Sequence, residues 1–291
     1  AMSLSSNNLD AFVEVARQKN FSVAAKKLHI TQSALSQRVL NLEQDIGSTL
    51  FIREPSGVRL TELGQRLLRY CQSKELLESE FMTSVQRSNS AHSKSLSGII
   101  RIAAFSTITR SVVVPIVAGF IKEHSELQVE IKNAELRELP SILSSGGADF
   151  IFLNQSLEKQ GIENHHLGFE ENVLVQSSAK SARDDIYLDH DEEDTTTHDF
   201  LKAQGRKVPV CKRSYLDEIY SIVDGVRHGM GRAVVPMHLV ESVKGIEVVS
   251  GYKPLKIPVY LTYYSQTFYT DLQKYIIERL IKEFPKYLSL R

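Results

Sequence analysis

The sequence predicts an N-terminal winged helix-turn-helix, followed by a long linker helix and a two-lobed α/β domain. Three observations lead to this fold class. Apolar residues recur at helical spacing through the first ninety residues, a short hairpin pattern interrupts them near residue 55, and strands alternate with helices from residue 98 onward. The expected divisions are 1–65 for the winged domain, 61–90 for the linker helix and 91–291 for the α/β domain.

Length and composition are those of an ordinary globular protein. The chain has 291 residues, enough for two or three domains, with 42% hydrophobic and 24% charged residues. No apolar run approaches the roughly 20 residues of a membrane-spanning helix, so we expect a cytoplasmic protein without a membrane partner. Cys71 and Cys211 are far apart in the sequence and predict neither a disulfide framework nor a metal site.

The charge is unevenly distributed, although the net charge is zero. Residues 1–95 hold 12 basic and 9 acidic side chains, whereas residues 96–291 hold 23 and 26. This mild asymmetry permits a DNA-binding N-terminus without demonstrating one.

The first thirty residues predict two short helices. "NNLDAFVEVARQKN" carries apolar residues three and four apart, with Asn7 or Asn8 as its N-cap, and "FSVAAKKLHI" follows with Ser22 in the N-cap position. Thr31 is the expected N-cap of a third helix. The second and third helices are joined by a turn of three residues, His29-Ile30-Thr31, which is typical of a helix-turn-helix.

The third predicted helix has one apolar stripe and one polar face. Leu35, Val39, Leu42 and Ile46 form the stripe. The candidate DNA-facing side chains are Gln32, Ser33, Ser36, Gln37 and Arg38. Amides can pair with adenine, hydroxyls with a base or a phosphate, and arginine with guanine or phosphate. On this stretch alone, a plain amphipathic helix with a solvated face remains an alternative.

A hairpin pattern follows and favours DNA binding. Leu50–Arg53 and Val58–Leu60 are short extended segments around a Pro-Ser-Gly turn. A hairpin after a helix-turn-helix is a wing, in which Arg53 and Arg59 are expected to meet phosphate or the minor groove.

A long helix is predicted next, capped by Thr61. Its roughly 28 residues would make a rod of about 40 Å with one apolar seam. Such a helix usually pairs with a second copy of itself, which supplies the two-fold symmetry of a palindromic DNA site. The expected dimerisation residues are Leu67, Tyr70, Leu77 and Phe81.

Together, these N-terminal residues resemble the winged helix-turn-helix of the LysR-type transcriptional regulators. The resemblance rests on Phe21-Ser22-Val23-Ala24-Ala25, Leu28, Thr31-Gln32-Ser33-Ala34-Leu35-Ser36, Leu42-Glu43, Gly47, Leu50-Phe51, Arg53, Leu60-Thr61 and Gly64. It implies that Thr31, Gln32, Ser33, Ser36 and Arg38 face DNA, that Arg53 is a wing contact, and that dimers often pair into tetramers. The wing departs from the family in carrying Glu54, where basic residues are common.

The remaining two thirds predict an α/β architecture in two lobes. A Ser-rich hinge, "AHSKSLSG", precedes alternating strands and helices, and the pattern restarts near residue 167. The expected lobes are 96–166 with 266–291, and 167–265, with a ligand-binding cleft between them. "GGADFIF" and "VDGVRHGMGRAVVP" make this half resemble the periplasmic-binding-protein-like effector domain of the same family.

Candidate effector ligands lie where predicted strands pass into helices. They are Ser106, Thr107, Asn154, Ser214, Tyr215 and Arg232. Hydroxyls and free N–H groups at such turns can hold an anion, although Ser106 and Ser214 could equally be plain caps, and Arg232 a surface arginine. The hydroxyl-rich turns, without an aromatic cage, favour a small carboxylate or an amino acid.

Other functions are less well supported. Phosphate-loop, dinucleotide-binding, nucleophile-elbow and HExxH motifs are absent from the sequence, so we expect no enzyme, no catalytic residue and no cofactor. The acidic stretch 184–199 fits no known metal-ligand spacing and predicts a solvated surface. A free solute-binding protein would leave the first 90 residues without a role. The expected partners are double-stranded operator or promoter DNA, a small-molecule effector and further copies of the chain, with RNA polymerase as another candidate.

Overall fold

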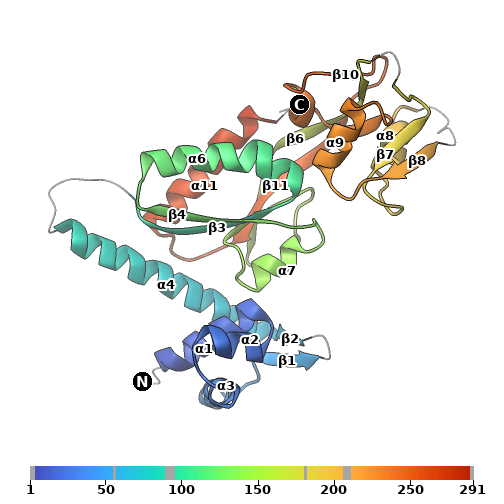
Figure 1. The fold of residues 1–291 in the computed structure, drawn as a ribbon. Helices are drawn as coiled ribbons and strands as arrows, with labels where there is room; N and C mark the ends of the chain where they lie inside the picture. The colour runs from blue at the N-terminus through green and yellow to red at the C-terminus, as the bar shows by residue number, and fades with distance from the viewer. Residues whose placement is uncertain (1–3, 55–56, 89–95, 180–181, 206–210, 289–291) are drawn as a thin grey trace.

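The computed structural model describes residues 4–54, 57–88, 96–179, 182–205 and 211–288. Three parts follow one another along the chain: a small helical head, a long helix and a larger α/β domain (Figure 1). Turn residues 55–56 and residues 91–95 of the predicted hinge lie outside the described residues. No helix within the described residues is long and apolar enough to cross a membrane.

The head has the predicted winged helix-turn-helix architecture. Its elements are α1 (Ser6–Gln18), α2 (Phe21–Lys27), α3 (Gln32–Ile46), β1 (Phe51–Glu54) and β2 (Gly57–Leu60). The hairpin pairs Phe51 with Leu60 in antiparallel register. Thr31 caps α3 as predicted, because its hydroxyl accepts a hydrogen bond from the Ala34 N–H at 3.2 Å.

Two predicted caps differ from the structure. The N-cap of α2 is Asn20, not Ser22, because its extended backbone places the amide oxygen 2.9 Å from the Ser22 N–H and 3.1 Å from the Val23 N–H. The first helix begins before Asn7, at Ser6, and its N-cap Ser5 makes no side-chain bond.

The core of the head includes the beginning of the long helix, α4 (Glu62–Ser88). Phe12, Leu35 and Phe51 are buried together with Leu67 and Leu68 of α4. The prediction that Leu67 dimerises is therefore wrong: only 9% of this side chain is exposed, and it packs against its own head. The first turns of α4 are part of the folded head.

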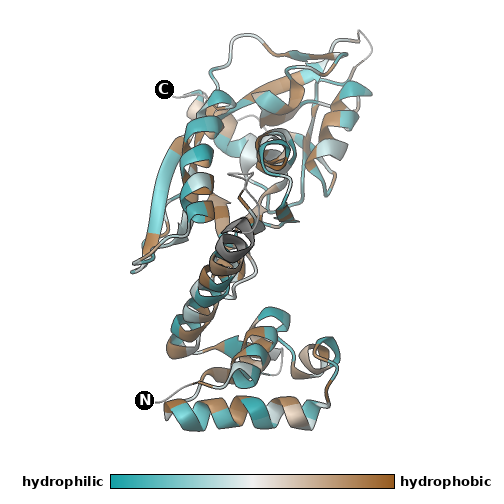
Figure 2. Ribbon diagram, turned by 90° about the vertical axis from the view of Figure 1, so that its left-hand side faces the viewer, coloured by the Kyte–Doolittle hydropathy of each residue, from teal (hydrophilic) through white to brown (hydrophobic). Residues whose placement is uncertain are grey.

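From Tyr70 onward, one side of α4 has a different environment. Figure 2 shows brown and teal segments alternating along this helix. Its exposed apolar side chains are Tyr70 (53% exposed), Leu77 (50%), Phe81 (65%) and Met82 (55%). These residues line an open groove with Lys74 and Glu78 on one face of the rod, and at least half of each of these four side chains is exposed.

The α/β domain is organised around one continuous sheet. Its strands are β3 (Gly98–Ala104), β4 (Leu127–Asn133), β5 (Phe150–Leu153), β6 (Ile162–Ser177), β9 (Ala233–Pro236), β10 (Ile246–Val248) and β11 (Leu255–Tyr264). The order is β10-β6-β11-β5-β3-β4, with β9 also paired to β6. A separate parallel pair is formed by β7 (Ile186–Asp189) and β8 (Lys212–Tyr215).

The two lobes share the antiparallel strands β6 and β11. Leu167 and Val259 are buried in the core of lobe I, whereas Val173 is buried in the core of lobe II. The chain therefore passes from lobe I to lobe II on β6, between Leu167 and Val173. It returns to lobe I on β11, near a register shift at Val259/Tyr260, and the predicted lobe boundary at residue 265 is corrected. A local strand pattern cannot show that one strand passes through two cores.

Helices cover both faces of lobe I. Helix α6 (Val114–Glu123) and α11 (Asp271–Glu283) pack on one face, and α7 (Leu139–Ser144) packs on the other (Figure 1). A short α5 (Ser106–Ile108) and a π-helical turn, Thr109–Val113, precede α6. Lobe II contains α8 (Thr196–Ala203), α9 (Ile219–Arg227) and α10 (Met237–Val240), and the 3₁₀ turn Phe284–Lys286 follows α11.

Candidate functional sites

The polar face of α3 is accessible, as a DNA-reading surface requires. Gln32, Ser33 and Gln37 are exposed, Ser36 and Arg38 are half-buried, and the opposite stripe Leu35, Val39 and Leu42 is buried. The Ser22 hydroxyl, from α2, donates to Gln32 Oε1 at 2.9 Å, and Gln37 Nε2 donates to Asn41 at 2.8 Å. Both amides are thus oriented before any ligand arrives.

The two wing arginines have different surroundings. Arg53 is exposed and its guanidinium lies 4.9 Å from the centre of the Phe21 ring. Arg59 Nε is 3.1 Å from Glu54 Oε1, so the acidic residue noted in the sequence neutralises Arg59 across the hairpin. Sequence reasoning also passed over the exposed Lys26 and Lys27, at the end of α2.

Two facing sheet edges, one in each lobe, carry most of the predicted effector ligands. In lobe I, β3 runs parallel to β4 and β5, so their carboxyl ends share one edge. In lobe II, β7 runs parallel to β8 and to the Arg232 end of β9. The edges meet where the Tyr220 hydroxyl of α9 donates to the Ser106 carbonyl at 3.4 Å, and where Arg110 stacks on Tyr220 at 4.1 Å.

Five of the six predicted ligands lie at these edges. Ser106 begins α5, directly after β3, and is half-buried. Thr107 is engaged, because its hydroxyl donates to Glu170 at 2.7 Å. Asn154 follows β5, and Ser214 and Tyr215 end β8. In the described part of the chain, no hydrogen bond or ring contact joins these last three side chains to the opposite lobe.

Arg232 is placed elsewhere, and its prediction as an effector ligand is corrected. It precedes β9, whereas the opposite end of that strand, Pro236, leads to the lobe interface. Its guanidinium contacts Gln176 at 3.0 Å and Asp184 at 3.6 Å. Ligands of parallel sheets bind beyond the carboxyl ends of the strands, and Arg232 lies at the amino end.

Sequence reasoning missed a polar cluster at the lobe crossover. Glu170 of β6 is only 4% exposed, and its Oε1 is 2.8 Å from His238 Nε2, on α10 of lobe II. The other ring nitrogen of His238, Nδ1, is 2.7 Å from the Ser111 hydroxyl of lobe I. These residues are far apart in sequence, so no local pattern could have connected them.

The acidic stretch of lobe II has a structural role. Asp189 is buried, 2% exposed, and is bonded to the Thr197 hydroxyl and to Arg213 Nε, the latter at 2.6 Å. The guanidinium of Arg213 also donates to the carbonyls of Asp191 and Glu192. Within the described residues, no group of three or more His, Cys, Asp or Glu side chains could hold a metal ion.

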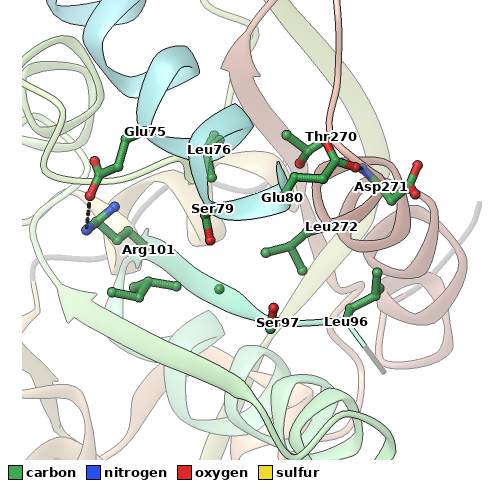
Figure 3. A pocket seen from close by; sticks show the side chains of 12 residues that line it. Glu75, Leu76, Ser79, Glu80, Leu96, Ser97, Arg101, Thr270, Asp271 and Leu272 are labelled. Atoms are coloured by element: carbon green, nitrogen blue, oxygen red, sulfur yellow. Dashed lines mark hydrogen bonds and ion pairs between the residues drawn. The ribbon is translucent and has the colours of Figure 1, made fainter. Parts of the chain in front are cut away.

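The long helix also contacts lobe I of its own chain. A cavity of about 240 Å³ lies between α4, β3 and the start of α11, as Figure 3 shows. Glu75 of α4 is 4.0 Å from Arg101 and 3.4 Å from Arg17 of the head. At the other side of this cavity, Glu80 accepts a hydrogen bond from the Asp271 N–H, at the beginning of α11. Polar contacts thus join the head, α4 and lobe I.

Asp149 lies beside this contact and carries an unusual carboxyl group. Its Oδ2 accepts a hydrogen bond from the Arg101 N–H at 2.9 Å. Burial raises the pKa of Asp149 from 3.8 to about 6, and the bond and the charge of Arg101 offset this only in part. The folded chain therefore binds a proton here more tightly than the unfolded chain does.

We expect Asp149 to make the stability of the protein depend on pH. Because its pKa is raised by folding, its contribution is full below about pH 4 and is lost as pH rises through about 6, amounting to about 1–3 kcal/mol. Asp149→Asn keeps the acceptor but removes the titration. Urea unfolding of both proteins from pH 4 to 7 should show Asp149→Asn gaining stability relative to the natural chain as pH rises. A difference that does not change with pH would contradict this assignment.

A winged helix-turn-helix, a long helix with an apolar seam and a two-lobed α/β domain define a class of ligand-responsive transcriptional regulators. The family model of the bacterial regulatory helix-turn-helix proteins, lysR family, matches residues 6–65. The LysR substrate binding domain matches residues 93–284. The chain therefore belongs to the LysR family of DNA-binding transcriptional regulators.

Individual relatives agree with this assignment. The HTH-type transcriptional regulator YofA of Bacillus subtilis (strain 168) is 25% identical over 242 residues, covering 82% of this chain and 83% of YofA. ArgP from Mycobacterium tuberculosis superposes with a TM-score of 0.75 at 20% identity, over 99% of this chain and 100% of ArgP. LysG from Corynebacterium glutamicum, with bound effector Arg, gives 0.72 at 16% identity, over 98% and 99%. The two structures share the fold of the whole chain.

Proposed function

We propose that this LysR-family regulator reads duplex DNA with the first turns of α3. The observation that carries the proposal is the exposed, uncharged and short polar face around Gln32, Ser33 and Gln37. It lies opposite the buried side chains of Leu35, Val39 and Leu42. Such a face can enter the major groove, where amides discriminate base edges. Thr31, Ser36 and Arg38 flank it, and Arg53 and Arg59 of the wing would reach the backbone or the minor groove.

Two protomers would present two such heads to a palindromic site. The exposed seam Tyr70, Leu77, Phe81 and Met82 supports pairing through α4, because exposed apolar patches on a helix mark an interaction surface. We divide the molecule functionally into a DNA-binding region 1–65, a dimerising helix 61–90 and an effector domain 91–291.

The effector would bind between the lobes, where Ser106, Thr107, Asn154, Ser214 and Tyr215 gather at the carboxyl edges. An effector that favours one lobe arrangement over another shifts the population of that arrangement, and thereby the spacing of the heads. Hydroxyl and amide groups at these edges suit a small carboxylate or an amino acid.

A thermal-shift screen of the full chain tests the effector site. The panel contains carboxylates, aromatic acids and amino acids, including arginine, because LysG was solved with bound effector Arg. A ligand of the cleft should stabilise the natural chain but not Ser106→Trp, since the indole fills the edge. Ser125→Trp is the matched control, because Ser125 is exposed and precedes β4 at the opposite sheet edge. Equal stabilisation of Ser106→Trp would exclude this site.

Separate arginine substitutions test the proposed wing contact. Arg53→Ala should weaken binding to all duplexes and lower the slope of log K against log salt by about 1, because one phosphate contact is lost. Arg59→Ala is the matched comparison and should change both quantities less, since Glu54 already neutralises Arg59. Fluorescence anisotropy on a random duplex at several salt concentrations measures both. A larger loss for Arg59→Ala would reverse the assignment.

A test of α3 is the substitution Gln32→Ala. We expect a loss of about 1–3 kcal/mol of discrimination at the bases that Gln32 contacts, with binding to random DNA nearly unchanged. Selection of preferred sequences from a random duplex library, for both proteins, gives the change in base preference. An identical preference would show that Gln32 does not contact a base.

A further inference from the structure

A buried polar cluster joins the two lobes of the effector domain. Thr107 and Ser111 belong to lobe I, His238 belongs to lobe II, and Glu170 lies between them on β6. The side chains of Glu170 and His238 are only 5% and 12% exposed. Among the described residues, no hydrogen bond between two side chains outside this cluster joins lobe I to lobe II.

The hydrogen bonds fix the protons of this cluster. The Ser111 hydroxyl donates to the Thr107 carbonyl at 2.6 Å, so its single proton is used. His238 Nδ1, 2.7 Å from Ser111 Oγ, must therefore donate. The 2.8 Å contact between His238 Nε2 and Glu170 Oε1 needs one further proton.

Such a pair is strong only while both partners are in place. Removing one member of a buried, hydrogen-bonded pair leaves the other without compensation. Separation of the lobes would instead break the hydrogen bonds that Thr107 makes to Glu170 and that Ser111 makes to His238, and would expose the His238–Glu170 pair to water. The cluster therefore resists a change in the angle between the lobes.

The same cluster controls one of the proposed effector ligands. The Thr107 hydroxyl, at the carboxyl edge of lobe I, donates its hydrogen bond to Glu170 Oε1 at 2.7 Å. Nearby, Tyr220 contacts the Ser106 carbonyl, and Arg110 stacks on Tyr220. The contacts at Ser106 and Thr107 thus hold the lobes together at the edge where an effector would bind.

We propose that His238 and Glu170 are positioning residues that clamp lobe I to lobe II and orient Thr107. The clamp sets the lobe angle of the ligand-free domain. Its regulatory meaning rests on the proposed effector site, since an effector at Ser106 and Thr107 must exchange a bond of this cluster to act on the lobe angle. Its existence as a clamp does not depend on that site.

Distance measurements between the lobes test the clamp. Spin labels are placed on the full chain at Arg137→Cys and Asp217→Cys, exposed positions beyond β4 and β8. Cys211 is replaced by serine, and Cys71 is retained because it is buried. The distance distribution is measured by double electron–electron resonance without DNA or effector. His238→Ala and Glu170→Ala should each shift and broaden the distribution. The shift in the double variant should be similar in size to that in either single variant, because each substitution breaks the same clamp.

Further variants separate a clamp from ordinary packing. Thr197→Val is the matched control, since it breaks a buried bond to Asp189 wholly inside lobe II and should lower the melting temperature without moving the distance. His238→Gln, which keeps a donor of similar reach, should restore a narrower distribution than His238→Ala. If His238→Ala does not fold, Thr107→Val and Ser111→Ala cut only the lobe I side and should shift the distance in the same direction.

An unchanged distance in the folded His238 or Glu170 variants, or in both lobe I variants, would overturn the clamp. This result differs from a failure of the effector site. The spin-label measurement contains no effector, whereas the Ser106→Trp screen depends on one, so each proposal can fail alone.

Discussion

Gly64→Ala is expected to unfold the DNA-binding head. A β-carbon at Gly64 would lie 2.3 Å from the Leu50 carbonyl oxygen and 2.9 Å from Leu60 Cδ2. The carbonyl cannot retreat easily, because it accepts a hydrogen bond from the Thr61 N–H at 2.9 Å. We expect a loss of about 3 kcal/mol or more in the free energy of unfolding of the head, and with it the loss of DNA binding.

Chemical unfolding and binding to a random duplex measure this effect. Gly119→Ala is the matched control, because Gly119 lies inside α6 and a β-carbon there would meet no atom within 4 Å. That substitution should be neutral or stabilising by up to about 1 kcal/mol, since alanine favours the helix. If Gly64→Ala were as stable as Gly119→Ala, the close approach of α4 to the wing would be wrong.

Leu77→Glu with Phe81→Glu is expected to convert dimers into monomers. Each side chain would bury apolar surface worth about 1.5–3 kcal/mol in a paired seam, and each protomer contributes both. Four opposing carboxylates would replace them, so the dissociation constant should rise by at least about 100-fold. DNA affinity should fall steeply because the two heads would bind independently.

Sedimentation velocity over a range of protein concentrations gives the dissociation constant. Val248→Glu is the control, because Val248 is also an exposed apolar residue (45%) but lies on β10, away from α4. It should leave the oligomer unchanged. A double variant of α4 that still sedimented as a dimer would place the dimer interface on another surface.

Local patterns predicted the head better than the effector domain. The stripe on α3, its Thr31 cap and the wing hairpin depend on residues within a few positions of one another, and the structure confirms these elements. Leu67 was misassigned for a related reason: one apolar period runs along α4, but its first turns face the head and its later turns face outward. Periodicity identifies a buried face without showing what buries it.

The candidate effector site depends on pairings that a single sequence does not reveal. Ser106 and Ser214 could be placed because Ser106 follows β3 and Ser214 lies near the end of β8, which is a local signal. His238 also follows a strand, β9, but its partner Glu170 is 68 positions away. Arg232 was misplaced because the direction of β9 relative to the other lobe follows from sheet topology, not from the Gly-Met-Gly segment before it.

The burial of Leu67, Leu68 and Cys71 in the head has a consequence for the geometry of the operator. Because the head and the start of α4 share one core, the reading helix cannot turn about the rod. The direction of the head around the rod axis, relative to the exposed seam, is therefore fixed by the number of residues between Cys71, in the core of the head, and Leu77, in the seam. Each residue added there would rotate the head by about 100° around the rod axis. In a dimer paired through α4, this segment of the rod would therefore set the helical phase of the two half-sites along the duplex.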